Sequence, residues 1–466
     1  MVSRLVIFPP QSGKHKRSAF NFILRAGAPL AVLCCLLGNS CKQGAGIRLL
    51  QSLKACPKTD DAMNGGCGLL PYIVLLAAAG AGGLLLCEWK PSRMANLWYL
   101  YAMTVVMCIM VMLRSSMVGV DYPTYQAYFE TVCQNSFSFL FSPNNIYRFE
   151  PGFSLLTYLF SLVTEDAVIY MGLIPVLIII PRAITIYKQS CSVWFSVFVY
   201  ISFGFFSYSM CTLRQELAIS IMLFALPYLK DRKILPYMLI IVLAACFHKS
   251  LWLMVPVYFL AVIPLNWKSI SFYAAGTLFV LIFSVPILGF VTQYVFKAYT
   301  PGSYYTWGRS FDTALMILVF LAVALLMKKH ILARDPKNIV LLNLYIYASI
   351  LFILTLKHFI FQRVGLMFLP VATFLLPEML YSIKPDESKY TELQTLDKQQ
   401  KKQQLSKFGA LRAQLRGERA IYYTAMGLFM AGCFYYYIFL LSSNRLLLVP
   451  YTTIFSSSVR QILVRS

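Results

Sequence analysis

Stretches of about 20 apolar residues recur from Ile23 to Leu441, and a helix of that length crosses the hydrocarbon core of a bilayer. They are apolar on every face, as in LLPYIVLLAAAGAGGLLL, so they lack the alternation of a membrane β-barrel strand. With 59% hydrophobic and 13% charged residues, the chain is more apolar than a soluble protein of 466 residues. We therefore predict an all-α, polytopic integral membrane bundle of about 12–13 transmembrane helices, without a soluble catalytic domain.

The apolar stretches divide the chain into four regions. Residues 1–68 are a basic extension, which is either signal-like or spurious sequence ahead of a true start near Met63. Residues 69–382 form the transmembrane core with an outer loop at 115–165, and residues 420–466 hold the last transmembrane helix and an outer tail. Residues 383–419 are a cytoplasmic amphipathic insert that we expect to lie on an anionic leaflet or, alternatively, to dock a partner. We predict spans near 69–87, 96–114, 166–187, 193–210, 212–229, 234–248, 249–265, 270–296, 311–329, 338–357, 364–382 and 420–441.

The distribution of charge sets the expected orientation. The formal net charge is +23, but Lys and Arg lie in loops and at helix ends rather than in one stripe with interleaved aromatic residues. This excludes a nucleic-acid-binding function and agrees with the retention of basic loops on the cytoplasmic side. We place Arg182 and Lys188, among other basic breaks, on that side of an inner membrane.

Twelve cysteines are scattered without CxxC pairs or His partners at metal-ligand spacing. We expect those within apolar spans, namely Cys87, Cys108, Cys246 and Cys433, to act as small buried hydrophobic residues. We predict no metal site and no cofactor.

In this topology many ionisable residues fall at helix ends on the non-cytoplasmic side, where together they would form one outward-facing polar site. They are Arg114, Asp121, Arg148, Glu150, Arg214, Glu216, His248, Lys249, Arg309, Asp312, His358 and Arg363.

Two of these residues have both an ordinary and a functional explanation. Arg214 opens an apolar helix in TLRQELA, and it either snorkels to lipid headgroups or binds phosphate through its planar guanidinium. His248 stands at a tight outer turn in ACFHKSLW. It either bonds a main-chain carbonyl or acts as an acid or base near neutral pH.

The outer loop combines aromatic rings with carboxylates. VGVDYPTYQAYF carries Asp121, Tyr122 and Tyr125, and YRFEPGFSLLTYLF places Glu150 beside Pro151 at a predicted helix start. A turn and a helix N-terminus explain both segments structurally. They would also suit a sugar, because Tyr rings stack on its CH groups while carboxylates accept its hydroxyl hydrogens.

In chain order, VGVDYPTY, EPGF, LRQELA, FHKS, an Arg in FQRVG and a late VPY resemble the EpsG family of exopolysaccharide polymerases, which is similar to the Wzy-type O-antigen polymerases. The resemblance covers about residues 69–460, apart from the insert. FHKS departs from the family by carrying Lys249 where a small or polar residue is more usual.

The resemblance implies a GT-C-like outward-facing cavity in a multi-pass protein of the bacterial inner membrane. Its activity would be polymerisation of undecaprenyl-diphosphate-linked oligosaccharide repeat units into exopolysaccharide, capsule or O-antigen at the outer face. The implied partners are this lipid-linked substrate, membrane lipids, and a chain-length regulator or flippase. Guanidinium groups would stabilise the leaving diphosphate without a metal, and a carboxylate or imidazole would take the proton of the attacking hydroxyl. The expected residues are Arg214, Arg309 and Arg363 for the diphosphate, Asp121, Glu150 and His248 for catalysis, and Tyr122 and Tyr125 for the sugar.

Two other functions stay open. A transporter or flippase of lipid-linked saccharides would also need a polar cavity, although the sequence shows no internal repeat. A membrane acyltransferase is less favoured, because no His–Asp signature is present.

Overall fold

The computed structural model describes residues 68–89, 91–290, 311–386 and 405–455. The chain divides at residues 64 and 65, and all described residues belong to the second unit, Gly65–Ser466. Most of the predicted extension, Arg309, the side chain of Asp312 and residues 387–404 of the predicted insert lie outside the described residues.

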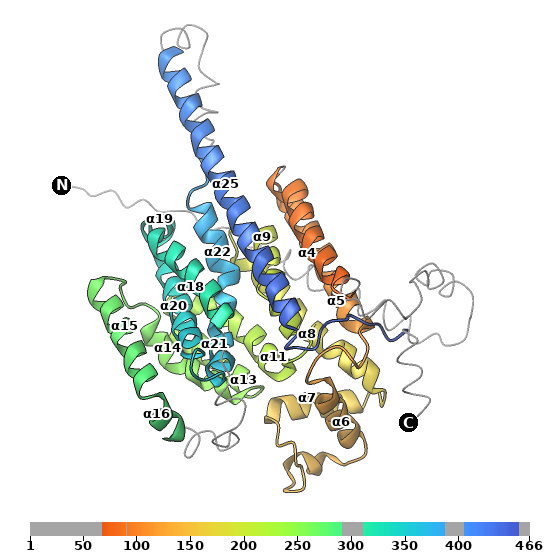
Figure 1. The fold of residues 1–466 in the computed structure, drawn as a ribbon. Coiled ribbons are helices and arrows are strands. Elements are labelled where there is room, and N and C mark those ends of the chain that lie inside the picture. Colours follow the sequence, from red (N-terminus) through yellow and green to blue (C-terminus); the bar gives the residue numbers. More distant parts are fainter. Residues whose placement is uncertain (1–67, 90, 291–310, 387–404, 456–466) are drawn as a thin grey trace, which may run out of the picture. The chain divides into compact units, whose positions relative to one another are not determined.

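Helices build the second unit (Figure 1), and the described ranges contain no strand beyond one isolated bridge between Arg114 and Thr453. Six spans are long and apolar enough to cross a membrane, and the bent pair α18 (Phe311–Leu326) and α19 (Lys328–Arg334) would make a seventh. The six are α4 with η1 (Leu70–Gly83, Leu84–Glu88), α5 (Arg93–Leu113), α8 (Ala167–Gln189), η6 with α20 (Pro336–Asn338, Ile339–Leu354), α21 with η7 and α22 (Ile360–Phe368, Leu369–Val371, Ala372–Tyr381), and α25 (Leu405–Ser443). The prediction of an all-α polytopic membrane protein is confirmed.

Fewer long spans are found in the described residues than the twelve or thirteen predicted, because several predicted spans are short or broken helices. Gly204, with a φ of 79°, separates the helix that ends at Ser202 from the next one, and Pro227 lies in the first turn of a separate short helix that begins at Leu226. Such breaks are tolerated at membrane depth where neighbouring helices cover them. The shorter elements are α9 (Val193–Ser202), α10 (Phe205–Tyr208), α11 (Leu213–Met222), η3 (Leu223–Ala225), α12 (Leu226–Lys230), α13 (Ile234–Ala245), η4 (Lys249–Leu253), α14 (Met254–Leu260), α15 (Trp267–Ile282) and α16 (Ser284–Phe290).

Helix α9 is central to the packing. All ten of its residues are buried, and it contacts α4, α5, α8, α22 and α25. Its Trp194 packs so closely on α4 that a Cβ at Gly83 would lie 2.5 Å from the indole ring. The same indole donates a hydrogen bond to Glu88, which also accepts hydrogen bonds from Tyr381, Lys384 and Tyr422. This carboxylate therefore joins α9, α22 and α25 to the end of η1.

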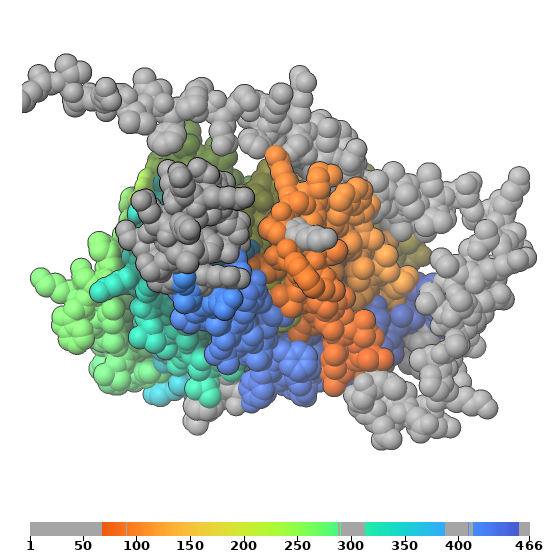
Figure 2. All heavy atoms as spheres, turned by 90° about the horizontal axis from the view of Figure 1, so that it is seen from above, coloured from red at the N-terminus to blue at the C-terminus, as the bar shows by residue number. Residues whose placement is uncertain are grey.

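Helix α25 is continuous for 39 residues. In the view of Figure 2 it lies between α4–α5 and α18–α20, and its Phe429 packs against Phe320 with ring centroids 5.8 Å apart. The predicted boundary between the insert and the last span, at residue 419, falls inside this helix. Residues 405–419 thus extend a spanning helix instead of forming a separate amphipathic segment.

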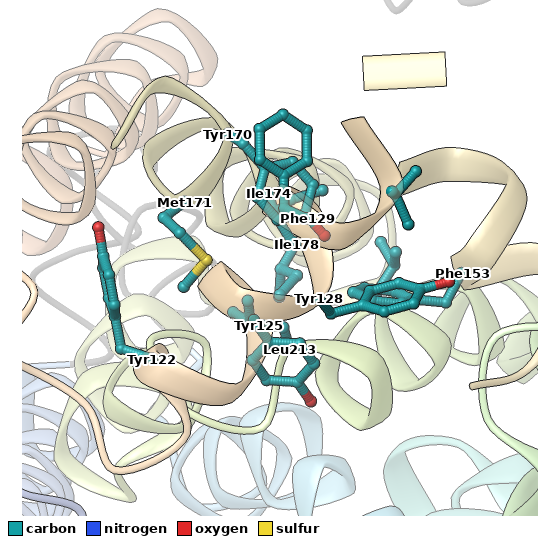
Figure 3. Close-up of a cluster of buried hydrophobic side chains, with 12 residues drawn as sticks. Tyr122, Tyr125, Tyr128, Phe129, Phe153, Tyr170, Met171, Ile174, Ile178 and Leu213 are labelled. Carbon is teal, nitrogen blue, oxygen red and sulfur yellow. The ribbon is translucent and has the colours of Figure 1, made fainter. Parts of the chain in front are cut away.

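The loop predicted to be outer folds into a small helical layer, residues 115–165, that we call the outer cap after this prediction. It contains α6 (Tyr122–Cys133), η2 (Phe137–Phe141) and α7 (Pro151–Ser161). Figure 3 shows that rings from α6 meet Phe153 of α7, Tyr170 of α8 and Leu213 of α11 in one buried cluster. Phe129 and Tyr170 stack with centroids 4.2 Å apart. The cap is thereby packed onto α8 and α11.

Candidate functional site

The EPG sequence sets the position of Glu150. Helix α7 begins at Pro151, as predicted, and Glu150 is its N-cap residue. The amide nitrogen of Gly152 donates to the main-chain oxygen of Cys246 at 2.8 Å, and a Cβ at Gly152 would lie 2.8 Å from the same oxygen. Only glycine permits this contact, which brings the start of α7 against the end of α13 and the turn that carries His248.

Glu150 contacts two segments that lie far from it in the sequence. Its Oε2 accepts a hydrogen bond from Nη1 of Arg214 at 2.6 Å, and its Oε1 lies 3.4 Å from Nδ1 of His248. The main-chain nitrogen of Lys249 also donates to Oε1, at 3.4 Å. The Glu150 side chain is only 10% exposed. The predicted grouping of Glu150, Arg214 and His248 is thus present.

Arg214 is held by protein groups, so headgroup snorkelling does not explain its position. Its guanidinium carbon stands 3.9 Å from the centroid of the Phe149 ring, which is a close cation–π contact. That ring packs in turn against Tyr125 and Tyr128, with centroids 5.8 and 4.6 Å away. Nε of Arg214 is buried without a hydrogen-bond partner among the described residues. Glu150 therefore fixes Nη1 of the guanidinium, and the N–H group at Nε can still donate a hydrogen bond.

Asp121 and Glu150 have opposite electrostatic environments. Burial raises the pKa of Asp121, and the charges of Arg363 and Arg214 only oppose that rise. Burial also acts to raise the pKa of Glu150, but the interactions with His248 and Arg214 outweigh it and lower that pKa to about 2. The Asp121 side chain makes no capping hydrogen bond to α6, and no hydrogen bond joins it to another described residue. Asp121 is therefore the stronger base of the two carboxylates.

Arg114 holds the loop that leads to Asp121. Contrary to its prediction as an outward-facing site residue, it is 2% exposed, and it donates to the main-chain oxygens of Met210 and Met171. Gly119 in this loop has a φ of 111°, and a Cβ there would lie 2.7 Å from the Met210 oxygen. Carbonyl oxygens partner Nη1 and Nη2 of this buried guanidinium, whereas Nε has no hydrogen-bond partner among the described residues.

The segment after α25 pairs with the same loop. The main-chain nitrogens of Ser115, Gly119 and Val120 donate to the oxygens of Thr452, Leu447 and Leu446, each at 2.9 Å. Tyr451, from the late VPY motif, donates its hydroxyl to the Met110 oxygen at 2.7 Å. The tail therefore supports the position of Asp121, which the sequence alone did not indicate.

The first turn of α11 uses three consecutive side chains to contact three elements. Arg214 reaches Glu150 on α7, Gln215 donates to the main-chain oxygen of Arg363 on α21 at 2.7 Å, and Glu216 reaches α8. The Gln215 bond places the first turn of α21, with the half-buried Arg363, beside α11. Gln215 was not predicted, because an amide in a polar helix start has no distinctive sequence signal.

Arg182 and Glu216 form a buried ion pair, with Nη2 and Oε2 2.5 Å apart and side chains 2% and 1% exposed. Arg182 was predicted at a basic break and Glu216 in the outward-facing site, yet Arg182 lies within α8 and both face the interior of the bundle. Nε of Arg182 also donates to Ser220 at 2.9 Å. An ionised side chain within a membrane bundle needs a partner, and the pairing of α8 with α11 supplies one.

The predicted sugar-binding tyrosines lie inside the protein. Tyr122 and Tyr125 are 2% and 5% exposed and belong to the buried cluster of the outer cap. Because protein atoms cover both rings, neither can stack on a sugar in this arrangement. Cys87, Cys108 and Cys433 are buried as expected, whereas Cys246 at the end of α13 is exposed.

Arg148 has a strained backbone that the sequence does not reveal. Its φ is +43°, a left-handed conformation that costs a non-glycine residue about 1–2 kcal/mol. The turn at this residue carries the chain from the outer loop to Phe149 and Glu150. No group of three or more His, Cys, Asp or Glu residues within the described ranges is placed to hold a metal ion.

A comparison with protein families matches residues 97–392, more than half of the chain, to the EpsG family. This range contains all of the site residues named above, and the tail with its VPY motif lies beyond it. Neither the search of curated proteins nor the search of solved structures found a match.

Proposed function

Since the chain belongs to the EpsG family, we propose that this multi-pass membrane protein is a polysaccharide polymerase of the bacterial inner membrane. The proposed donor is a glycan on undecaprenyl diphosphate, and the acceptor is a second lipid-linked repeat unit at the outer face. The product would be exopolysaccharide, capsule or O-antigen.

The observation that carries this proposal is the polar cluster of Asp121, Glu150, Arg214 and His248, with Arg363 beside it. These residues come from four helix ends and one turn, and they combine a half-buried carboxylate with fixed cationic charge. Glycosyl transfer from a diphosphate needs both, because a proton must leave the acceptor while negative charge grows on the leaving group.

In the proposed reaction, an acceptor hydroxyl oxygen bonds to the anomeric carbon of the donor sugar. The bond from that carbon to the diphosphate oxygen breaks, and the electron pair leaves with the lipid diphosphate. We assign the hydroxyl proton to Asp121, because its pKa is raised by burial and its carboxylate accepts no hydrogen bond from the described residues. Glu150, with a pKa of about 2, is too weak a base for this step.

Glu150 has a different role in this scheme. Its hydrogen bond fixes one edge of Arg214, and the Phe149 ring supports the guanidinium from one face. A cation positioned before the reaction stabilises developing charge without reorganisation. We propose that Arg214 and Arg363 contact the diphosphate and that Glu150 and His248 position Arg214. Arg309, which the resemblance also implies, lies outside the described residues.

The test is chain extension by purified protein in detergent, supplied with lipid-linked repeat units extracted from the cells that make it. A polymerase lengthens the glycan without a sealed membrane, whereas a flippase leaves its length unchanged. We expect Arg214→Ala and Arg363→Ala to abolish extension, and Asp121→Asn to slow it by about 10²–10⁴-fold. Arg214→Lys should restore little, because an ammonium lacks the planar fork.

The control is Arg416→Ala, which removes an exposed cation from α25. It should extend glycans at the wild-type rate. Wild-type glycan length in both the Arg214 and Arg363 variants would refute the diphosphate assignment, and no extension by the wild-type protein would favour the flippase alternative.

A further inference from the structure

An open pocket of about 440 Å³ lies in the outer cap, within the segment from Leu140 to Phe149. The hollow is open to solvent, so a ligand would lie against its lining residues without being enclosed. The proposed mechanism does not use it. Its lining combines two aromatic rings, those of Phe141 and Phe149, with the polar side chains of Ser142, Asn145 and Arg148.

The pocket wall is held in shape by its own hydrogen bonds. Asn145 is 2% exposed, and it donates to the main-chain oxygen of Leu140 at 3.3 Å and accepts from the nitrogen of Tyr147 at 3.2 Å. The Oγ of Ser142 accepts from the nitrogen of Asn144 at 3.1 Å. Because these groups are already engaged, the loop is preorganised, and the pocket needs little ordering when a ligand binds.

The free groups of the pocket indicate the ligand. Phe141 is 70% exposed, so its ring is open to contact the apolar CH face of a sugar. Arg148 is exposed, and no hydrogen bond or ion pair joins its guanidinium to another residue in the described part of the chain. The lining contains no acidic side chain. A ring surface beside an unneutralised guanidinium suits a sugar that carries a carboxylate.

The pocket adjoins the catalytic cluster. Phe149 lines it and also lies beneath Arg214, and the next residue is Glu150. Arg148, which lines the pocket beside Phe149, has a left-handed backbone with a φ of +43°. Strained backbone of this kind is retained where the surrounding structure requires it.

We propose that this pocket is a saccharide subsite that binds an acidic sugar residue of the glycan, with Arg148 pairing with the sugar carboxylate and Phe141 contacting the ring. The inference rests on the proposed function, because it takes the glycan as the substrate. It adds a specificity for acidic repeat units that neither the family match nor the catalytic cluster supplies.

The test is direct binding by titration calorimetry, using the purified full chain in detergent. The probes are a hyaluronan tetrasaccharide, which contains glucuronic acid, and chitotetraose, which is neutral. We expect the wild-type protein to bind the acidic probe about tenfold more tightly, since a charge-assisted hydrogen bond has a net effect of that order. Arg148→Asn should remove this preference, and Phe141→Ala should weaken the binding of both probes.

The variants separate binding from folding. Asn tolerates the left-handed region, so Arg148→Asn should melt at or above the wild-type temperature, and the charge control Arg416→Gln should bind as the wild type does. Equal affinity of the wild type for the two probes, or an unchanged preference in Arg148→Asn, would overturn the proposal. The assay does not use chain extension, so failure of the pocket and failure of the polymerase assignment give different results.

Discussion

Replacing Glu150 by Gln should destabilise the protein in a way that depends on pH. The side chain is 10% exposed, and its pKa falls from an ordinary 4.5 to about 2 because His248 and Arg214 outweigh the effect of burial. A carboxylate whose pKa is lower in the folded protein than in the unfolded chain stabilises the fold. This stabilisation is complete when the pH is above the pKa of the unfolded state, and it is lost as the pH falls through the pKa of the folded state. The 2.5-unit difference corresponds to about 3 kcal/mol at pH 7.

The same linkage gives the size of the effect in acid. At pH 3 the unfolded carboxyl is nearly all protonated and the folded one mostly ionised, so about 1.4 kcal/mol of stabilisation remains. The difference in unfolding free energy between wild type and Glu150→Gln should therefore shrink by about 2 kcal/mol between pH 7 and pH 3. Denaturant unfolding in detergent micelles at both pH values measures it.

The matched control is Glu130→Gln. Glu130 is an exposed carboxylate of the same outer cap, and it accepts a hydrogen bond from the nearby Gln126 side chain at 2.8 Å. This substitution should change stability by a few tenths of a kcal/mol, with little dependence on pH. A Glu150→Gln effect that is constant from pH 7 to pH 3, or no larger than that of Glu130→Gln, would refute the electrostatic argument.

Three further substitutions test the framework of the site by thermal unfolding. Arg182→Leu leaves the buried Glu216 carboxylate without its partner and should lower the free energy of unfolding by about 3–5 kcal/mol. The double variant Arg182→Leu with Glu216→Leu should recover most of that stability. A double variant as unstable as the single one would contradict this. Gly152→Ala should lower the free energy of unfolding by about 1–3 kcal/mol and slow chain extension, because the added Cβ would lie 2.8 Å from the main-chain oxygen of Cys246. The control is Gly276→Ala, which has open space around its Cβ and should not change stability. In Arg114→Lys, the ammonium cannot reach both the Met210 and the Met171 oxygens, so the free energy of unfolding should fall by about 1.5–3 kcal/mol. An unchanged melting temperature would show that these hydrogen bonds do not stabilise the protein.

The amino-acid sequence was sufficient for the class of fold, and it pointed to Glu150, Arg214 and His248 as candidates that the structure brings together. Uncharged apolar stretches require helices in a bilayer, since each backbone polar group must be satisfied within its own segment. Pro151 after Glu150 predicted the start of α7, and the basic loops allowed Asp121, Glu150, Arg214 and His248 to be assigned to one side. These features are local or periodic, so they can be recognised in one sequence.

The tertiary structure decided which polar residues meet and which are buried. Arg114, Arg182 and Glu216 carry the same charges as the site residues, but packing places their charged groups against carbonyls or against each other. The burial of Tyr122 depends on α6 lying against α7 and α8. Contacts between segments that are distant in the chain leave no pattern in either one, because each side chain is chemically suited to several partners and only the packing selects one.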